Sequence, residues 1–165
     1  MTKIEIDIPY GAEMIHAVLP AGKLLGTLDV ADTAGLENQD SAIRGAIQHP
    51  IGLEKNIFEI VNPGETVAIV VPDSFRTTRI EKVLPVLVDG LLESGIAEVD
   101  ISFIYATGTH RGPTPDEERK ILGDSIYERF KNQAYSHDPR DEDNLVYTGT
   151  TSRGTKVHLN RRVHE

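Results

Sequence analysis

The chain has 165 residues, a length that fits one compact domain, and its 17 Lys and Arg against 26 Asp and Glu give a net charge of −9. This acidic balance offers no basic surface for nucleic acid or an anionic membrane, and the absence of cysteine excludes disulfides, thiolate metal ligands and cysteine nucleophiles. No apolar run approaches the roughly 20 residues that cross a bilayer, and the N-terminus lacks a signal-peptide pattern, so we expect a cytoplasmic protein.

The first predicted elements are short strands, which two helices follow. Isoleucines alternate with acidic residues over residues 4–8, which predicts a half-buried strand. Residues 14–19 and 24–28 predict two more strands, separated by turn residues. The apolar spacing then predicts helices over residues 40–48 and 53–61.

The centre of the chain predicts a strand, a helix and a second strand. Residues 67–71 form a continuous apolar run, which is typical of a parallel strand covered on both faces. Residues 80–95 repeat apolar side chains at helical spacing, and Pro85 is expected either to kink that helix or to mark its start. A second apolar strand is predicted over residues 99–105, and a helix that Thr114 caps comes next.

This alternation of strands and helices predicts an α/β fold. We expect a Rossmann-like, mainly parallel sheet with flanking helices, preceded by an N-terminal segment that resembles a β-hairpin. After the central strands and helices, residues 134–137 predict a short strand, and residues 145–149 and 156–159 predict a hairpin. Residues 1–165 are therefore interpreted as a single α/β domain.

Two polar loops follow the two apolar strands, over residues 73–79 and 106–112. Ligands of an open α/β sheet collect at the carboxyl ends of its parallel strands, so both loops are expected at one edge. Arg76 offers a planar cation that matches a carboxylate or a phosphate, and His110 is a candidate acid or base. Asp73 can orient the arginine or fix a tautomer of the histidine.

The second loop also predicts a place for an anion, because Thr107, Gly108 and Thr109 can expose backbone amides before a helix. A simpler interpretation stays open for each loop: Asp-x-x-Arg is often a loop salt bridge, and a lone loop histidine is often a surface residue. His137 follows a predicted strand, so it either reaches the same edge or caps a local element. No carboxylate and histidine cluster has metal-ligand spacing, so no metal ligand is assigned.

Five motifs follow one another along the chain. They are Asp73-x-x-Arg76, Ala106-Thr107-Gly108-Thr109-His110-Arg111, Leu122-Gly123, His137-Asp138 and Gly149-Thr150-Thr151-Ser152-Arg153-Gly154-Thr155. In this order and spacing the chain resembles, over nearly its whole length, the N-terminal domain of nickel-dependent lactate racemase and its homologues. Phe75 and Thr77 depart from the family, which usually has Thr and Pro at these places.

The resemblance implies an isomerase that carries a nickel-pincer nucleotide and racemises a lactate-type 2-hydroxy acid by hydride transfer. It implies that His110 is an acid/base histidine, that Arg76 orients the substrate carboxylate, and that Asp73 is its neighbour in the site. In the family, the lysine that tethers the cofactor, the histidine that ligates nickel and a second acid/base histidine belong to a C-terminal domain. We therefore expect an N-terminal half that is inactive alone.

The expected partners are thus a C-terminal domain of the same protein and a small 2-hydroxy acid, with no nucleic acid or membrane partner. An alternative hypothesis is a non-enzymatic α/β module that binds a small anion or a nucleotide phosphate at the same edge of the sheet. A third is a structural domain whose polar loops only cap the ends of its strands.

Overall fold

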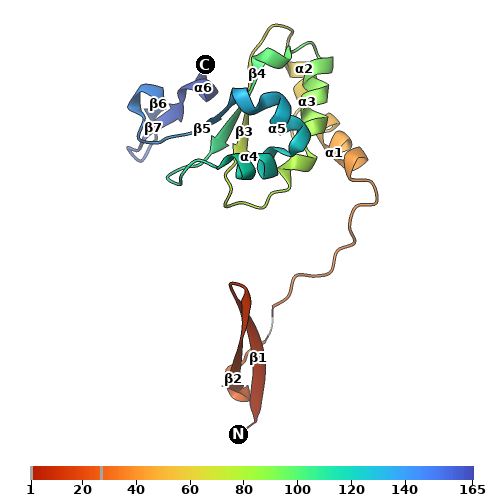
Figure 1. Ribbon diagram of the computed structural model, residues 1–165, viewed down its shortest axis with the longest axis vertical. Coiled ribbons are helices and arrows are strands. Elements are labelled where there is room, and N and C mark those ends of the chain that lie inside the picture. The colour runs from red at the N-terminus through yellow and green to blue at the C-terminus, as the bar shows by residue number, and fades with distance from the viewer. Residues whose placement is uncertain (1, 27) are drawn as a thin grey trace. The chain divides into compact units, whose positions relative to one another are not determined.

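The computed structural model describes residues 2–26 and 28–165, and the chain divides into two compact units, one up to Gly35 and one from Leu36 to Glu165. In the first unit, strands β1 (Lys3–Tyr10) and β2 (Glu13–Pro20) pair antiparallel (Figure 1). The turn between them contains Gly11 at a φ of +63°, a conformation that glycine adopts without steric cost. The expected N-terminal hairpin is confirmed.

The described residues of the segment 24–28 form no third strand. A 3-10 turn, η1 (Ala21–Lys23), follows the hairpin, and residues 24–26 and 28 have no regular structure, while residue 27 lies outside the described part of the chain. The side chains of Leu25 and Leu28 are exposed. The prediction of a strand over residues 24–28 is wrong because an apolar pattern forms a strand only where a partner strand accepts its backbone hydrogen bonds.

The second unit is built on a parallel sheet of the strand order β3-β4-β5. These strands are β3 (Val67–Pro72), β4 (Ile101–Ala106) and β5 (Ala134–Ser136), and both neighbouring pairs are parallel (Figure 1). The predicted Rossmann-like α/β fold with a parallel sheet and flanking helices is confirmed.

Three helices cover one face of this sheet and form the core with it. They are α3 (Leu84–Glu93), α4 (Pro115–Leu122) and α5 (Asp124–Phe130). Phe103 of β4 and Phe130 of α5 have no solvent exposure, and their rings meet edge to face with centroids 5.3 Å apart. The core therefore fixes the sheet from the side of the crossover helices.

The opposite face of the sheet is covered less completely than the apolar run predicts. Val70 of β3 is 51% exposed, whereas Ile104 of β4 is buried on the same face. The C-terminal helix α6 (Arg161–His164) contacts β3, and its Arg162 guanidinium lies 3.8 Å from the centroid of the Tyr135 ring. The prediction that both faces are buried is thus wrong for the edge strand β3, because only the short helix α6 contacts its second face.

Local capping explains where the earlier helices begin and end. Helix α1 (Gln39–Gln48) agrees with its prediction, and the Asn38 side chain caps it. The helix expected over residues 53–61 is reduced to the single turn α2 (Ile57–Ile60). Asn56 and Glu59 form a capping box that starts this turn, and the Asn62-Pro63-Gly64 sequence after it ends it.

Pro85 marks the beginning of regular helix and produces no internal kink. It lies in the first turn of α3, where a proline needs no hydrogen-bond donor. The residues before it form a separate 3-10 turn, η2 (Ile80–Lys82), which starts after Arg79 in a left-handed conformation with a φ of +57°. The predicted helix over residues 80–95 is therefore divided in two.

The C-terminal part contains the expected hairpin, in which β6 (Leu145–Thr150) pairs antiparallel with β7 (Lys156–Asn160). Three further 3-10 turns connect the elements: η3 (Glu98–Asp100), η4 (Lys131–Gln133) and η5 (Glu142–Asn144). Over residues 2–26 and 28–165, none of the helices combines the length and the apolar character that a membrane crossing requires.

We expect Phe103→Ala to lower the free energy of unfolding by about 3–5 kcal/mol, because it removes a buried aromatic ring from the centre of the core. Val70→Ala is the matched control, since this side chain lies in the adjacent strand but is half exposed, and its cost should stay below about 1 kcal/mol. Chemical denaturation measures both values. Equal losses for the two variants would contradict this assignment of the core.

Candidate functional site

The parallel pairing of β3 with β4 places the two polar loops at one edge of the sheet. Pro72 at the end of β3 lies opposite Ala106 at the end of β4. Asp73 and Thr107 are the next residues, so the loops begin side by side. Both side chains are buried, although each belongs to a polar loop. The structure therefore brings together the two loops in which the sequence predicted a site.

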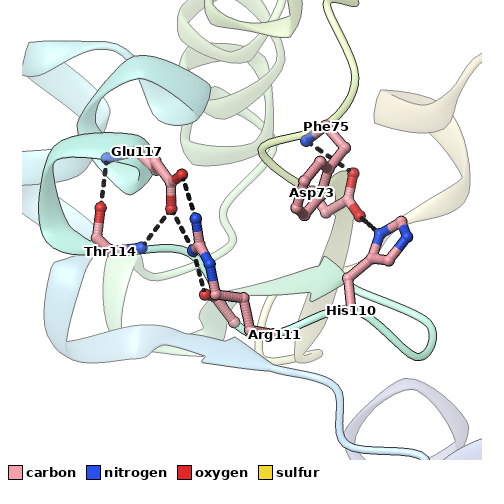
Figure 2. A network of polar contacts seen from close by, with 7 residues as sticks. Asp73, Phe75, His110, Arg111, Thr114 and Glu117 are labelled. Atoms are coloured by element: carbon pink, nitrogen blue, oxygen red, sulfur yellow. Dashed lines mark hydrogen bonds and ion pairs between the residues drawn. The ribbon is translucent and has the colours of Figure 1, made fainter.

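Asp73 and His110 are joined by a hydrogen bond of 2.6 Å between Oδ2 of the carboxylate and Nδ1 of the ring (Figure 2). The other carboxylate oxygen accepts the backbone N–H of Phe75 at 3.2 Å. The hydrogen bond to His110 is the main cause that lowers the pKa of Asp73, and burial of the carboxylate opposes it. The Phe75 amide and the nearby charge of Arg76 lower the pKa further, by smaller amounts. Because an ionised carboxylate only accepts, the proton lies on Nδ1, which leaves Nε2 free to accept another.

The ring of Phe75 packs against the ring of His110. Their centroids are 4.5 Å apart and their planes are tilted by 53°. The guanidinium of Arg111 lies 5.9 Å from the centroid of the Phe75 ring, on the same loop as His110. The sequence did not predict the contact between Phe75 and His110. Phe75 stands where the family that the chain resembles usually has threonine, and this difference does not show which side chain the ring would touch.

Arg111 is held by an ion pair with Glu117 of α4. Two hydrogen bonds of 2.7 Å join its two terminal nitrogens to the two carboxylate oxygens (Figure 2). Glu117 also accepts the backbone N–H of Thr114 at 2.8 Å, and the Thr114 hydroxyl accepts the Glu117 amide, so the predicted capping box is confirmed. These bonds lower the pKa of Glu117 to about 2, with Arg111 as the largest cause.

Thr107 ties the second loop to the end of the third parallel strand. Its side chain is 2% exposed, and its hydroxyl donates a hydrogen bond to the carbonyl of His137. The His137 amide in turn donates to the carbonyl of Tyr105 at 3.1 Å, and its Nδ1 lies 3.3 Å from Nδ2 of Asn160. His137 thus reaches the same edge of the sheet, where its backbone supports the loop.

Gly108 and Thr109 form the exposed tip of this loop. Gly108 has a φ of +56°, which glycine adopts at no steric cost, and a Cβ there would meet no atom within 4 Å. Within the described ranges, the amides of these two residues donate no hydrogen bond, whereas the His110 amide donates to the Thr107 carbonyl at 2.9 Å. Two backbone donors are therefore available to an anion at this tip.

Arg76 lies in the same loop as Asp73 but does not bond to Asp73 or His110 through its side chain. In residues 2–26 and 28–165 its guanidinium takes part in no hydrogen bond or ion pair, and it lines a pocket of about 400 Å³ between its own loop and α4. Nor do three His, Asp or Glu side chains of these ranges gather as a metal ion would require. The site thus consists of an oriented imidazole and a separate, unpaired guanidinium.

Comparison with known proteins shows the family of the chain. Residues 10–165 match the family model of the lactate racemase N-terminal domain, and the chain belongs to this family. It is 27% identical over 158 residues to the lactate racemase of Thermoanaerobacterium thermosaccharolyticum, an alignment that covers 94% of this chain and 36% of the relative.

A solved structure of the lactate racemase apoprotein from that organism has a similar fold, with a TM-score of 0.73 and 26% identity. The match covers 96% of this chain and 36% of that one. The chain therefore spans little more than a third of the length of the relative it matches.

We expect the carboxyl group of Glu117 to titrate with a pKa of about 2, below the ordinary 4.5 of glutamate. Because the folded-state pKa is lowered, the pair with Arg111 stabilises the fold above about pH 4.5 and this stabilisation disappears as the pH falls towards 2. Arg111→Gln should raise the pKa of Glu117, whereas Arg44→Gln, which removes an exposed cation from α1, should not. Carboxyl NMR shifts measure this, and a wild-type midpoint near 4.5 would contradict it.

Proposed function

We propose that this chain is the N-terminal part of a racemase or epimerase of lactate-type 2-hydroxy acids, and that it contributes to a cleft completed by a C-terminal domain. The family membership supports this proposal. The single observation that carries it is the bond between the buried carboxylate of Asp73 and the half-exposed ring of His110 at the edge of the sheet. In this proposal the chain alone is inactive.

His110 is the acid/base group of the proposed site. With the proton on Nδ1 held by Asp73, its Nε2 can take the proton of a substrate hydroxyl and return it. The ionised carboxylate of Asp73 stabilises the imidazolium that forms when Nε2 is protonated. Asp73 is therefore a positioning residue that acts through His110, and the packed ring of Phe75 restricts the rotation of the imidazole.

Arg76 is the proposed anchor of the substrate carboxylate. Its guanidinium is exposed, and it has no acidic partner among the described residues, so it can form two parallel hydrogen bonds with a carboxylate. A fixed cation of this kind holds the α-carbon of the substrate in one orientation. Hydride transfer at that carbon requires such an orientation.

The tip of the second loop fits an anionic group of the family's cofactor. We propose that Thr107, Gly108 and Thr109 contact the nickel-pincer nucleotide, Gly108 and Thr109 through their free amides and Thr107 by holding them in place. The nucleotide, when bound, would supply acceptance and return of the hydride at the α-carbon. The lysine tether, the nickel-ligating histidine and a second acid/base histidine are proposed to come from the C-terminal domain. A cytoplasmic location stays a prediction.

A second candidate function is a non-enzymatic module that binds a small anion. The free amides of Gly108 and Thr109 favour it, since they need no further domain to act. The two candidates differ in the role of His110, because anion binding at the loop tip does not use the Nε2 atom.

We expect His110→Ala and Arg76→Ala each to abolish most racemisation in the full-length enzyme loaded with cofactor. Loss of the acid/base group should lower kcat by about 10²- to 10⁴-fold, and loss of the arginine should mainly lower kcat/KM. Interconversion of the two enantiomers, followed by chiral chromatography, measures both. His49→Ala and Arg44→Ala alter exposed residues at α1 and should leave the rates unchanged. Wild-type rates in both site variants would refute the assignment.

Asp73→Asn should lower kcat by about 100-fold or more and change KM little, because the amide no longer enforces the proton on Nδ1. Asp29→Asn, which alters an exposed residue of the first unit, is the control. A merely structural role for Asp73 would instead lower the melting temperature and leave kcat per folded molecule intact. Steady-state kinetics and thermal unfolding of the same preparations distinguish the two roles.

A further inference from the structure

The pocket beside Arg76 is larger than a single carboxylate requires. Its volume of about 400 Å³ lies within the usual range of small-molecule sites, about 300–1,000 Å³. The loop after β3 forms one wall, and α4 forms the other with Lys120. Asp73 and His110 do not line it, so the pocket is separate from the bonded imidazole.

This pocket carries positive charge that its own carboxylates do not neutralise, although the whole chain is acidic. Glu81 in its lining is bound by Arg79, with 2.8 Å between Nε and Oε1, and Glu117 is bound by Arg111. Both carboxylates are therefore neutralised by arginines. The side chains of Arg76 and Lys120 form no ion pair within the described ranges, which leaves two cations without an acidic partner in the lining of this pocket, in a protein of net charge −9.

The remaining polar lining also suits an anion. Ser74, Thr77 and Thr78 line the pocket, and in the described part of the chain their hydroxyls take part in no hydrogen bond. A hydroxyl can donate to a carboxylate or phosphate oxygen and rotates to do so. Charged and neutral donors thus surround the same cavity.

We propose that this pocket binds an anionic group, a carboxylate or a phosphate, through Lys120 and these hydroxyls. The proposal rests on the proposed function, in which Arg76 holds the first carboxylate of a 2-hydroxy acid. Because Lys120 lines the same cavity, a substrate with a second acidic group places that group against a free cation. Lys120 is then the residue that selects diacids or phosphorylated 2-hydroxy acids over lactate. The phosphate of the cofactor is the other source of the same chemistry.

The test uses the full-length protein without cofactor at low salt, titrated calorimetrically with lactate, with malate and with inorganic phosphate. Malate, a 2-hydroxy diacid, should bind on the order of tenfold more tightly than lactate, which corresponds to one charged hydrogen bond. Lys120→Gln should remove this difference and Lys120→Arg should preserve it. Lys55→Gln removes an exposed lysine outside the pocket and should change nothing.

A second measurement, nucleotide retention by the cofactor-loaded full-length protein after dialysis, distinguishes the two sources of the anion. If Lys120→Gln weakens malate binding and leaves nucleotide retention after dialysis unchanged, the substrate supplies the group. If it releases nucleotide and leaves malate binding unchanged, the cofactor phosphate supplies it. Equal affinities of wild type and Lys120→Gln for malate and phosphate, together with equal nucleotide retention, would overturn the proposal.

The outcomes also separate this inference from the proposed function. Racemisation that depends on His110 but not on Lys120, with no anion affected by Lys120→Gln, would refute only the anion pocket. Racemisation that survives His110→Ala and Arg76→Ala, while Lys120→Gln still weakens malate binding, would refute only the proposed function.

Discussion

The parallel pairing of β3 with β4 is the constraint on which the candidate site depends. It holds Pro72 level with Ala106, and the loops that follow begin together although they are far apart in the sequence. The bond between Asp73 and His110 joins residues 37 positions apart, which this register brings together. The rings of Phe103 and Phe130 pack together in the core on the helix-covered face of the sheet. Packing in the core therefore supports the strand positions on which the site geometry depends.

Most of this arrangement could be predicted because parallel strands have strong local signals. The apolar runs in β3 and β4 and the capped start of α4 are local patterns, and the position of Asp73 near His110 followed from topology alone. The predictions that failed concern strand pairing, burial and side-chain packing, which depend on residues distant in the sequence. Residues 24–26 and 28 have no partner strand, Val70 is half exposed, and no local pattern shows that Phe75 would pack on His110.

The acidic composition of the chain is a poor guide to its local charge. Net charge describes the average field of the whole surface, whereas a ligand meets the charges that remain after local pairing. The two carboxylates that line the pocket are paired, Glu81 with Arg79 and Glu117 with Arg111, so Arg76 and Lys120 are the charges of the lining that remain. A chain with a net charge of −9 can therefore present a site for an anionic ligand.

Glu117 has two structural tasks, because one carboxylate accepts the Thr114 amide at the start of α4 and also holds Arg111. The order of the second loop is thus coupled to the formation of a helix. An insertion or deletion among the five residues between Arg111 and Glu117 would prevent this carboxylate from serving both partners at once. The length of this segment should therefore vary less during evolution than the identity of the residues within it, and the helix and the loop should form in a single cooperative event.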